Sequence, residues 1–384
     1  MMLSTVDEAP LSLSSRVVML VDLDYFFAQA EEIRNPAIRD KPVVVCVYSG
    51  RSEDSGAVST SNYIARGYGV KSGMPIVQAK RKLENIEAVF LPVDHVYYDQ
   101  VSEKVMDILR SYADRFEQVG VDEAFVEATM RTEGDFEKAR SLAQAMKEKL
   151  KAQLGLSCSI GVGPNKLVSK VAADEQKPNG LTVIKPEEVE HFLFPLPVRR
   201  LIGVGMKTEE RMHDMGINTV GDLAKVDVQR LIDIFGKKLG TYFYNTSRGL
   251  DDDPVEEKGE AESFSRIATL KQDSHDLALI LEKTDQLCKE IHNTLVQQKL
   301  SFKTVGIVAF MEDLTAYSRS KTLEIQTNAI EIMKQTVKEL YAKLLSEVQF
   351  DVRRVGVKVS GFAKEQKGQK RLTSFLEPAQ DSQP

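Results

Sequence analysis

The stretch VVMLVDLDYFFAQAEE, residues 17–32, joins a buried strand to acidic and aromatic side chains. Five apolar residues in a row, 17–21, are typical of a strand that is covered on both faces. The run ends on Asp22 and Asp24, which lie two positions apart on an extended chain and can therefore share one face at the strand end. A core strand that delivers carboxylates beside aromatic rings predicts a functional site at that edge of the sheet.

A second acidic pair, Asp122 and Glu123, stands at the start of another apolar segment, GVDEAFVE. If the two strands are neighbours in one sheet, these carboxylates and Asp22 converge and can hold two divalent ions. Hard oxygen ligands without histidine favour Mg²⁺ over zinc. Two such ions about 3.5–4 Å apart stabilise the attacking and leaving oxygens of a phosphoryl displacement. The same spacing also fits ordinary strand-end acids that face water, so both interpretations stay open here.

The length and composition are those of a globular protein with more than one domain, because 384 residues exceed one ordinary core. No apolar run approaches the roughly 20 residues that span a bilayer, and the start of the chain lacks the features of a signal peptide. Cys46, Cys158 and Cys288 are far apart, which is typical of core residues in a reducing compartment. We therefore expect a cytoplasmic protein without a zinc site and without a membrane partner.

The net charge of −6 argues against a nucleic-acid-binding surface that covers the whole molecule. However, the segment DDDPVEEKGEAE, residues 251–262, holds seven acidic residues and one lysine, a charge equal to that of the entire chain. Any basic surface is therefore local. The segment itself is predicted to be an acidic linker.

The order of apolar patterns indicates an α+β protein built from several domains. A mixed body of strands and helices runs from residue 16 to 184. Residues 185–250 combine helix signals with short glycine turns, which is typical of a small all-helical domain. Residues 263–363 alternate as strand, helix, strand, strand, helix and strand and predict a compact α+β domain. The polar tail, 364–384, has too few apolar residues to fold alone.

Four polar residues are candidates for holding a polyphosphate. Thr60, Tyr63 and Arg66 recur at every third position and would lie along one side of a helix. A hydroxyl, a phenol and a guanidinium on one stripe can bind phosphate oxygens. Lys177 follows a predicted helix on a turn with proline and glycine, from which its ammonium could reach the same ligand. The alternative is a solvated helix face.

The segment LIGVGMKTEERMHDMGI, residues 201–217, has the pattern of a helix-hairpin-helix. Gly203 and Gly205 would let backbone N–H groups approach DNA phosphates without reading bases. The alternative is a helical hairpin held by packing alone.

In the tail, one helical turn would project four side chains from a single side: Gln369, Leu372, Phe375 and Leu376. This pattern favours a docking peptide over a leftover strand.

Five segments together match a known family in order and spacing: VDLDYFFAQAEE, KPVVVCVYSGR, GAVSTSNYIARGYGVKSGMP, GVDEAFVE and SCSIGVGPNKLVSKVAADEQKPNG. Over residues 16–362 the chain resembles the Y-family translesion DNA polymerases of the DinB type, and most of all their archaeal members. The resemblance implies a low-fidelity, DNA-directed DNA polymerase that adds dNTPs to a primer 3′-OH opposite damaged bases. It also implies a right-hand architecture: an N-terminal extension (1–15), palm (16–33 and 93–184), fingers (34–92), helical thumb (185–250), acidic linker (251–262), little finger (263–363) and a tail with a clamp-binding peptide (364–384).

The resemblance also implies roles for single residues. Asp22, Asp122 and Glu123 match the metal-binding carboxylates, and the carbonyl of Leu23 matches a further ligand, for two Mg²⁺ ions that Mn²⁺ can replace. Asp24 matches an acid that the family does not use as a principal ligand. The remaining matches are residues that grip the triphosphate (Thr60, Tyr63, Arg66 and Lys177), an aromatic steric gate against ribose (Phe27), and small residues above the nascent base pair (Ala57, Ser59, Ser72 and Gly73).

The partners implied are primer–template DNA, a dNTP and a sliding clamp bound by the tail, with the protein itself a monomer. Spacing alone also allows another two-metal enzyme, such as a nuclease or a nucleotide cyclase, or a non-catalytic, clamp-tethered DNA-binding protein. Neither the nuclease nor the cyclase accounts for the thumb, linker, little finger and clamp peptide together. The presence of Asp22, Asp122 and Glu123 argues against the non-catalytic protein.

Overall fold

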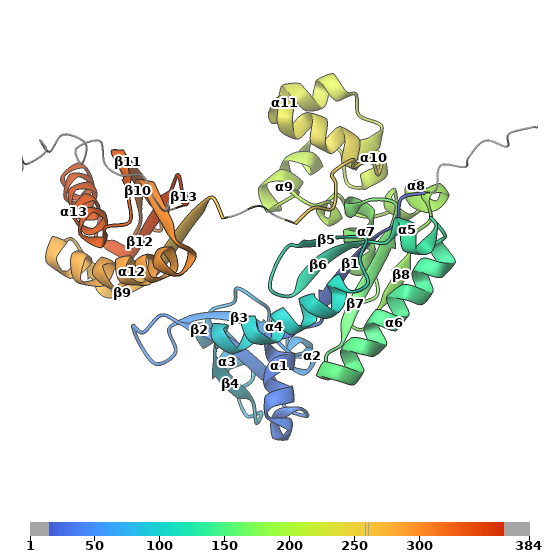
Figure 1. The fold of residues 1–384 in the computed structure, drawn as a ribbon, viewed down its shortest axis with the longest axis horizontal. Coiled ribbons are helices and arrows are strands. Elements are labelled where there is room, and N and C mark those ends of the chain that lie inside the picture. The colour runs from blue at the N-terminus through green and yellow to red at the C-terminus, as the bar shows by residue number, and fades with distance from the viewer. Residues whose placement is uncertain (1–14, 258, 260, 365–384) are drawn as a thin grey trace, which may run out of the picture. The chain divides into compact units, whose positions relative to one another are not determined.

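The computed structural model describes residues 15–257, 259 and 261–364 of the chain. It divides into two compact units, Met1–Val47 with Ala57–Lys258 and Tyr48–Gly56 with Gly259–Pro384, which are described separately (Figure 1). Within the described residues no helix is both long and apolar enough to cross a membrane.

The centre of the first unit is a five-stranded sheet in the order β5 (Arg115–Gln118), β6 (Glu123–Glu127), β1 (Val18–Leu23), β7 (Cys158–Gly163) and β8 (Leu181–Val183). The strand β1 occupies the middle and runs antiparallel to both of its neighbours, and Asp22 pairs with Glu123 across them. The condition set by the sequence, that the two acidic strands are neighbours, is therefore confirmed.

Both faces of β1 are covered, which explains its unbroken apolar run. Met19 and Val21 belong to a large core that includes residues of α4 (His95–Arg110) and α6 (Phe136–Leu154). Val18 and Leu20 point the other way and pack with Ala173, at the end of α7 (Lys166–Ala173), and with Val255. The strand that carries Asp22 is thus buried on both sides.

Val255 also changes the interpretation of the acidic segment. Its side chain is completely buried, Asp251 accepts a hydrogen bond from the backbone N–H of Leu167 at 2.8 Å, and Arg16 donates to the carbonyl of Asp253 at 3.0 Å. Residues 251–257 therefore belong to the first unit and are not a free spacer. The pattern missed this because one valine among acids has no periodicity.

A smaller three-stranded sheet, in the order β3 (Gly56–Ser61), β2 (Val43–Tyr48) and β4 (Val89–Pro92), adjoins the central one. The helices around it are α1 (Phe26–Arg34), α2 (Tyr63–Gly67) and α3 (Ile76–Lys82); a further short helix, α5, spans Thr129–Thr132. Asn62 begins α2, because its Oδ1 accepts the N–H of Ala65 at 3.0 Å.

The all-helical region predicted over 185–250 is confirmed. It holds α8 (Val189–Leu193), α9 (Met206–Asp214), α10 (Val220–Ala224) and α11 (Val228–Thr246). Gly203 has a φ of +85°, which side chains rarely adopt, and Gly205 is the N-terminal cap of α9. The two glycines form the turn that the helix-hairpin-helix pattern requires.

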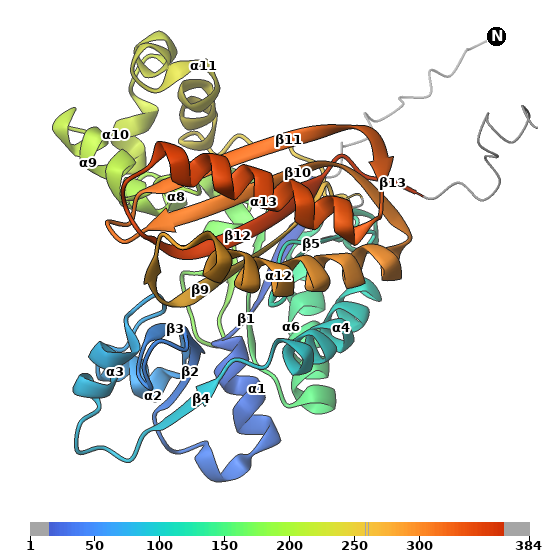
Figure 2. The same ribbon diagram turned by 90° about the vertical axis from the view of Figure 1, so that its left-hand side faces the viewer.

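The second unit contains an antiparallel sheet in the order β11 (Ala316–Thr327), β10 (Leu300–Met311), β12 (Val352–Ser360) and β9 (Ser263–Ser274), with the short β13 (Ala363–Lys364) beside β10. The helices α12 (Leu277–Gln298) and α13 (Ile330–Glu347) lie together against one face of the sheet (Figure 2). The order of elements is the one the sequence predicts.

Candidate active site

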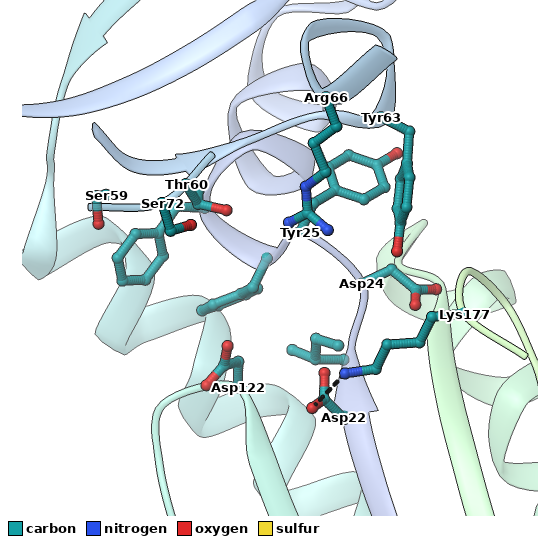
Figure 3. Close-up of a pocket in the computed structure, with 13 residues that line it drawn as sticks. Asp22, Asp24, Tyr25, Ser59, Thr60, Tyr63, Arg66, Ser72, Asp122 and Lys177 are labelled. Atoms are coloured by element: carbon teal, nitrogen blue, oxygen red, sulfur yellow. Dashed lines mark hydrogen bonds and ion pairs between the residues drawn. The ribbon is translucent and has the colours of Figure 1, made fainter. Parts of the chain in front are cut away.

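A cavity of about 290 Å³ opens where the end of β1, the start of α1, β3, α2 and the turn after α7 meet (Figure 3). Most of the predicted metal and nucleotide residues line it together: Asp22, Leu23, Phe27, Ser59, Thr60, Tyr63, Arg66, Ser72, Asp122 and Lys177. Asp24, Tyr25 and Phe26 complete the lining. Segments that are up to 155 positions apart in the sequence thus converge on one site.

Asp22 and Asp122 form the acidic wall of the cavity. The backbone N–H of Leu23 donates to the carbonyl of Asp122 at 2.9 Å, which fixes the two strand ends together. The pKa of Asp22 is raised to about 6. Burial is the main cause, Lys177 opposes it, and the charges of Asp122 and Glu123 add to it. Burial also raises the pKa of Asp122, with the charge of Glu123 adding to it. Crowded, partly buried carboxylates of this kind are stabilised by a cation.

Glu123 lies next to this wall but outside the cavity lining. Both of its carboxylate oxygens accept from the ammonium of Lys170, at 2.9 and 3.0 Å. In the part of the chain that the structure describes, no three acidic, histidine or cysteine side chains are grouped closely enough to hold a metal. The donor chemistry, carboxylates with a backbone carbonyl and no histidine, nevertheless fits a hard divalent ion.

Lys177 and Arg66 supply the positive charge. The ammonium of Lys177 donates to Asp22 Oδ2 and forms an ion pair with Asp174, both at 2.8 Å. Burial lowers the pKa of Lys177, but the two carboxylates outweigh it and raise the pKa above its ordinary value. The guanidinium of Arg66 lies 4.7 Å from the ring centre of Tyr63, and its Nε donates to the carbonyl of Ser61 at 2.9 Å.

The prediction that Thr60, Tyr63 and Arg66 share one helix is wrong in its geometry. Thr60 lies on β3, and α2 begins only at Tyr63 because Asn62 caps it. All three side chains still line the cavity. The strand β3 and the helix α2 therefore bring the three side chains to one cavity, although they do not lie on one helix.

Phe27 lies on the first turn of α1 and lines the cavity. Its ring stacks on that of Tyr98 with centroids 4.2 Å apart and planes 14° from parallel. The hydroxyl of Tyr98 donates to Glu31 at 2.9 Å. A ring held in this way offers a rigid surface to a ligand. The smaller roof residues Ala57 and Gly73 lie outside the lining, two positions before Ser59 and directly after Ser72 in the sequence.

The prediction that Asp22 and Asp24 share one face of an extended strand end is not supported. The strand β1 ends at Leu23, so the alternation of an extended chain stops before Asp24. Asp24 is 1% exposed, and its two oxygens accept from three donors of the protein.

Tyr25 also lines the cavity, which the sequence analysis missed. It precedes α1 with a φ of +37°, and its hydroxyl donates to Glu32 at 3.2 Å, which no sequence pattern shows.

Comparisons with known proteins agree with this geometry. Family models match residues 21–174 (impB/mucB/samB family), 199–251 (DNA polymerase-iota, thumb domain) and 261–372 (impB/mucB/samB family C-terminal domain). The chain is 48% identical to DNA polymerase IV of Nitrosopumilus maritimus, over 95% of this chain and 100% of that protein. It is 46% identical to DNA polymerase IV 1 of Methanosarcina mazei, over 94% and 99% of the two chains.

Solved structures give the same result. A chimera of the Y-family DNA polymerases Dbh and Dpo4 matches with a TM-score of 0.86 and 35% identity, over 91% of this chain and 100% of that one. An insertion ternary complex of Dbh DNA polymerase matches with a TM-score of 0.66 and 34% identity, over the same shares.

Fold, cavity and relatives define a DNA-directed DNA polymerase of translesion synthesis. The chain belongs to the Y family of DNA polymerases, in the DNA polymerase IV or DinB branch. Enzymes of this family depend on divalent metal ions and work by a two-metal mechanism.

Proposed function

We propose that the cavity binds the triphosphate of an incoming dNTP and directs its α-phosphorus toward a primer 3′-OH. One observation carries the proposal: carboxylates of Asp22 and Asp122 share a single cavity with the donors of Thr60, Tyr63, Arg66 and Lys177 (Figure 3). A triphosphate needs donors along its length and metal ligands at its reacting end. The arrangement provides both.

Two Mg²⁺ ions, or Mn²⁺ in their place, would be held by Asp22, Asp122, Glu123 and the carbonyl of Leu23. When bound, such ions stabilise the charge that develops on the attacking and leaving oxygens. The raised pKa values of Asp22 and Asp122 support this assignment, because carboxylates that are buried near other acids favour a bound cation.

The chain's own donors bind and orient the nucleotide. Arg66, Tyr63, Thr60 and Lys177 would contact phosphate oxygens and hold the triphosphate in line for displacement. Phe27, stacked on Tyr98, would collide with a ribose 2′-OH and so select deoxynucleotides. Small side chains above the base pair would leave room for damaged or mispaired bases and lower fidelity: Ala57, Ser59, Ser72 and Gly73.

Primer–template DNA would be contacted through backbone N–H groups around Gly203 and Gly205 and by the second unit. The fold is that of a Y-family polymerase with a thumb domain and a C-terminal little-finger domain. The exact bounds of palm, fingers, thumb and little finger, the monomeric state and the cytoplasmic location stay predictions. The proposed clamp-binding residues lie outside the described residues: Gln369, Leu372, Phe375 and Leu376. Deleting 364–384 should abolish stimulation by a sliding clamp and leave basal extension intact; equal stimulation of both proteins would contradict this.

Primer extension on undamaged and abasic templates, with Mg²⁺ and dNTPs, tests the proposed site. We expect extension on both templates and its loss in Asp122→Ala. The control is Asp114→Ala, which removes a carboxylate that accepts from two backbone N–H groups at the start of α5, among residues that do not line the cavity. Degradation of the primer, or full extension by Asp122→Ala, would overturn the assignment and favour a nuclease or a different site.

A further inference from the structure

Asp24 is a buried carboxylate in the wall of the cavity, next to Lys177 and Tyr63 (Figure 3). Its Oδ1 accepts from the hydroxyl of Ser159 at 2.8 Å. Its Oδ2 accepts from the hydroxyl of Ser157 and from the backbone N–H of Asn179, both at 2.9 Å. Both oxygens are therefore engaged by the protein, which leaves Asp24 badly placed to act as a metal ligand.

These donors join the start of β7 to the turn that carries Lys177. Ser159, besides donating to Asp24, accepts from the backbone N–H of Gly180 at 3.2 Å. Asn179 and Gly180 follow Lys177 by two and three residues. A carboxylate that is anchored on β7 thus holds the backbone of the turn just after the lysine.

A buried lysine holds the same turn from the other side. Lys147, on α6, donates to the carbonyls of Cys158 at 2.7 Å and Gly180 at 3.0 Å. Burial lowers the pKa of Lys147, and the charge of Asp24 acts against that shift. Asp24 and Lys147 are buried charges of opposite sign, and each is stabilised by hydrogen bonds to the protein. Asp24 binds the N–H of Asn179, and Lys147 binds the carbonyl of Gly180.

From these contacts we infer that Asp24 is a positioning residue for Lys177: it fixes the turn at 179–180, with Lys147 as its counterpart, so that the lysine ammonium projects into the cavity. The inference rests on the proposed role of Lys177 in binding the triphosphate. The ammonium of Lys177 is carried on a flexible side chain with several rotatable bonds. Fixing the backbone of the turn therefore limits the range of positions that the ammonium can take. Asp24 would then act on nucleotide binding and would not touch the substrate.

The first experiment measures single-nucleotide insertion by the full-length enzyme, with the KM for dNTP and kcat determined separately. Asp24→Ala should raise the KM for dNTP about tenfold, the effect of losing one charge-assisted contact, and change kcat much less. The dissociation constant for primer–template DNA should stay the same. A fall in kcat with an unchanged KM, or a higher requirement for Mg²⁺, would overturn the inference and indicate a metal ligand.

The conservative variant Asp24→Asn separates these roles further. Its oxygen can accept from Asn179 and Ser157, and its amide can donate to the Ser159 hydroxyl, so the turn should hold and the KM should return to within about threefold of the original. A metal ligand would not be rescued in this way. Ser159→Ala serves if Asp24→Ala does not fold: it removes one hydrogen bond to Asp24 and should raise the KM by a smaller factor, and an unchanged KM there would contradict the inference.

A double-mutant cycle with Lys177→Ala distinguishes failure of the inference from failure of the proposed function. In the Lys177→Ala background, Asp24→Ala should add almost nothing to the KM. A full additional effect would show that Asp24 acts independently of Lys177 and would overturn the inference alone. If Lys177→Ala itself leaves the KM unchanged, the role proposed for Lys177 fails, and the inference fails with it. The matched control, Asp114→Ala, should leave the KM and kcat as they are.

Discussion

The acidic and donor walls of the cavity differ in how their side chains are held. The acidic wall comes from neighbouring strands of one sheet, and Asp22 and Asp122 sit at raised pKa values because they are buried near other acids. The donor wall comes from β3, α2 and the turn after α7. Each of its two cations is held by the protein: Arg66 donates to the carbonyl of Ser61, and Lys177 binds the carboxylates of Asp22 and Asp174. Asp24 holds the turn just after Lys177.

This difference assigns different work to the two walls. The buried carboxylates of the acidic wall are stabilised by a bound cation. Because bound metal ions stabilise the charge that develops during phosphoryl transfer, this wall should control the chemical step. The donor wall is arranged before a ligand arrives, so it should control how tightly the nucleotide binds. Substitutions on the two walls should therefore separate kcat from KM.

The largest effect is expected at Glu123, which lies beside the acidic wall. Glu123→Ala should lower kcat by on the order of 10²–10³-fold, as the loss of a group that stabilises developing charge does. Single-turnover primer extension measures it. Lys170→Met, which removes the partner of Glu123 and leaves the carboxylate in place, should keep far more activity. Equal losses in both variants would mean that Glu123 serves only as an ion-pair partner of Lys170.

On the donor wall, Arg66→Ala should raise the KM for dNTP by roughly 10- to 100-fold, because a charge-assisted hydrogen bond contributes about 1.5–3 kcal/mol. The change in kcat should be smaller. Steady-state insertion kinetics give both constants, with Arg81→Ala, an exposed arginine on α3, as the control. A loss confined to kcat would abolish the distinction between the walls.

Between the walls, Phe27→Ala should weaken discrimination against ribonucleotides by at least about tenfold, because the ring that would exclude a 2′-OH is removed. Phe27→Tyr keeps the ring and serves as the control. Competing insertion of an rNTP and the matching dNTP measures the ratio. Unchanged selectivity in the alanine variant would remove Phe27 from its gate role.

The smallest effect concerns stability. The folded pKa of Asp22, about 6, lies above its ordinary value of 3.8, so the native state binds more protons between these pH values and loses stability as pH rises through them. Asp22→Asn, which stays neutral, should raise the Tm at pH 7.5 with a chelator present by roughly 2–5 °C. At pH 3.5 the two proteins should melt alike. A lower Tm for the variant at pH 7.5 would show that the pairing with Lys177 outweighs burial.

The sequence predicted the acidic wall better than the donor wall, and for a physical reason. An apolar run that ends on carboxylates is a local pattern, and Asp22 and Asp122 lie where it places them. The prediction that Thr60 lies on a helix with Tyr63 and Arg66 was wrong because the helix begins only after Asn62. The side chain of Asn62 accepts the N–H of Ala65 and caps the helix there, which depends on the rotamer of this one residue. Contacts between residues far apart in the chain give no local sequence pattern and could not be predicted. The ion pair of Glu123 with Lys170, for example, spans 47 positions.

The burial of β1 on both faces has a consequence for strand slippage. Because its residues are apolar on either face, a shift by one position would keep nearly the same buried surface, and packing alone specifies the alignment only weakly. Polar contacts at the two ends of β1 specify the alignment of the strand with its neighbours. Arg16 bonds to Glu127 at 3.2 Å and the N–H of Val17 to Thr129 at 3.0 Å at one end, while the N–H of Leu23 meets Asp122 at the other. The contact between Leu23 and Asp122, which both line the cavity, thus also helps to hold the strand in a single alignment.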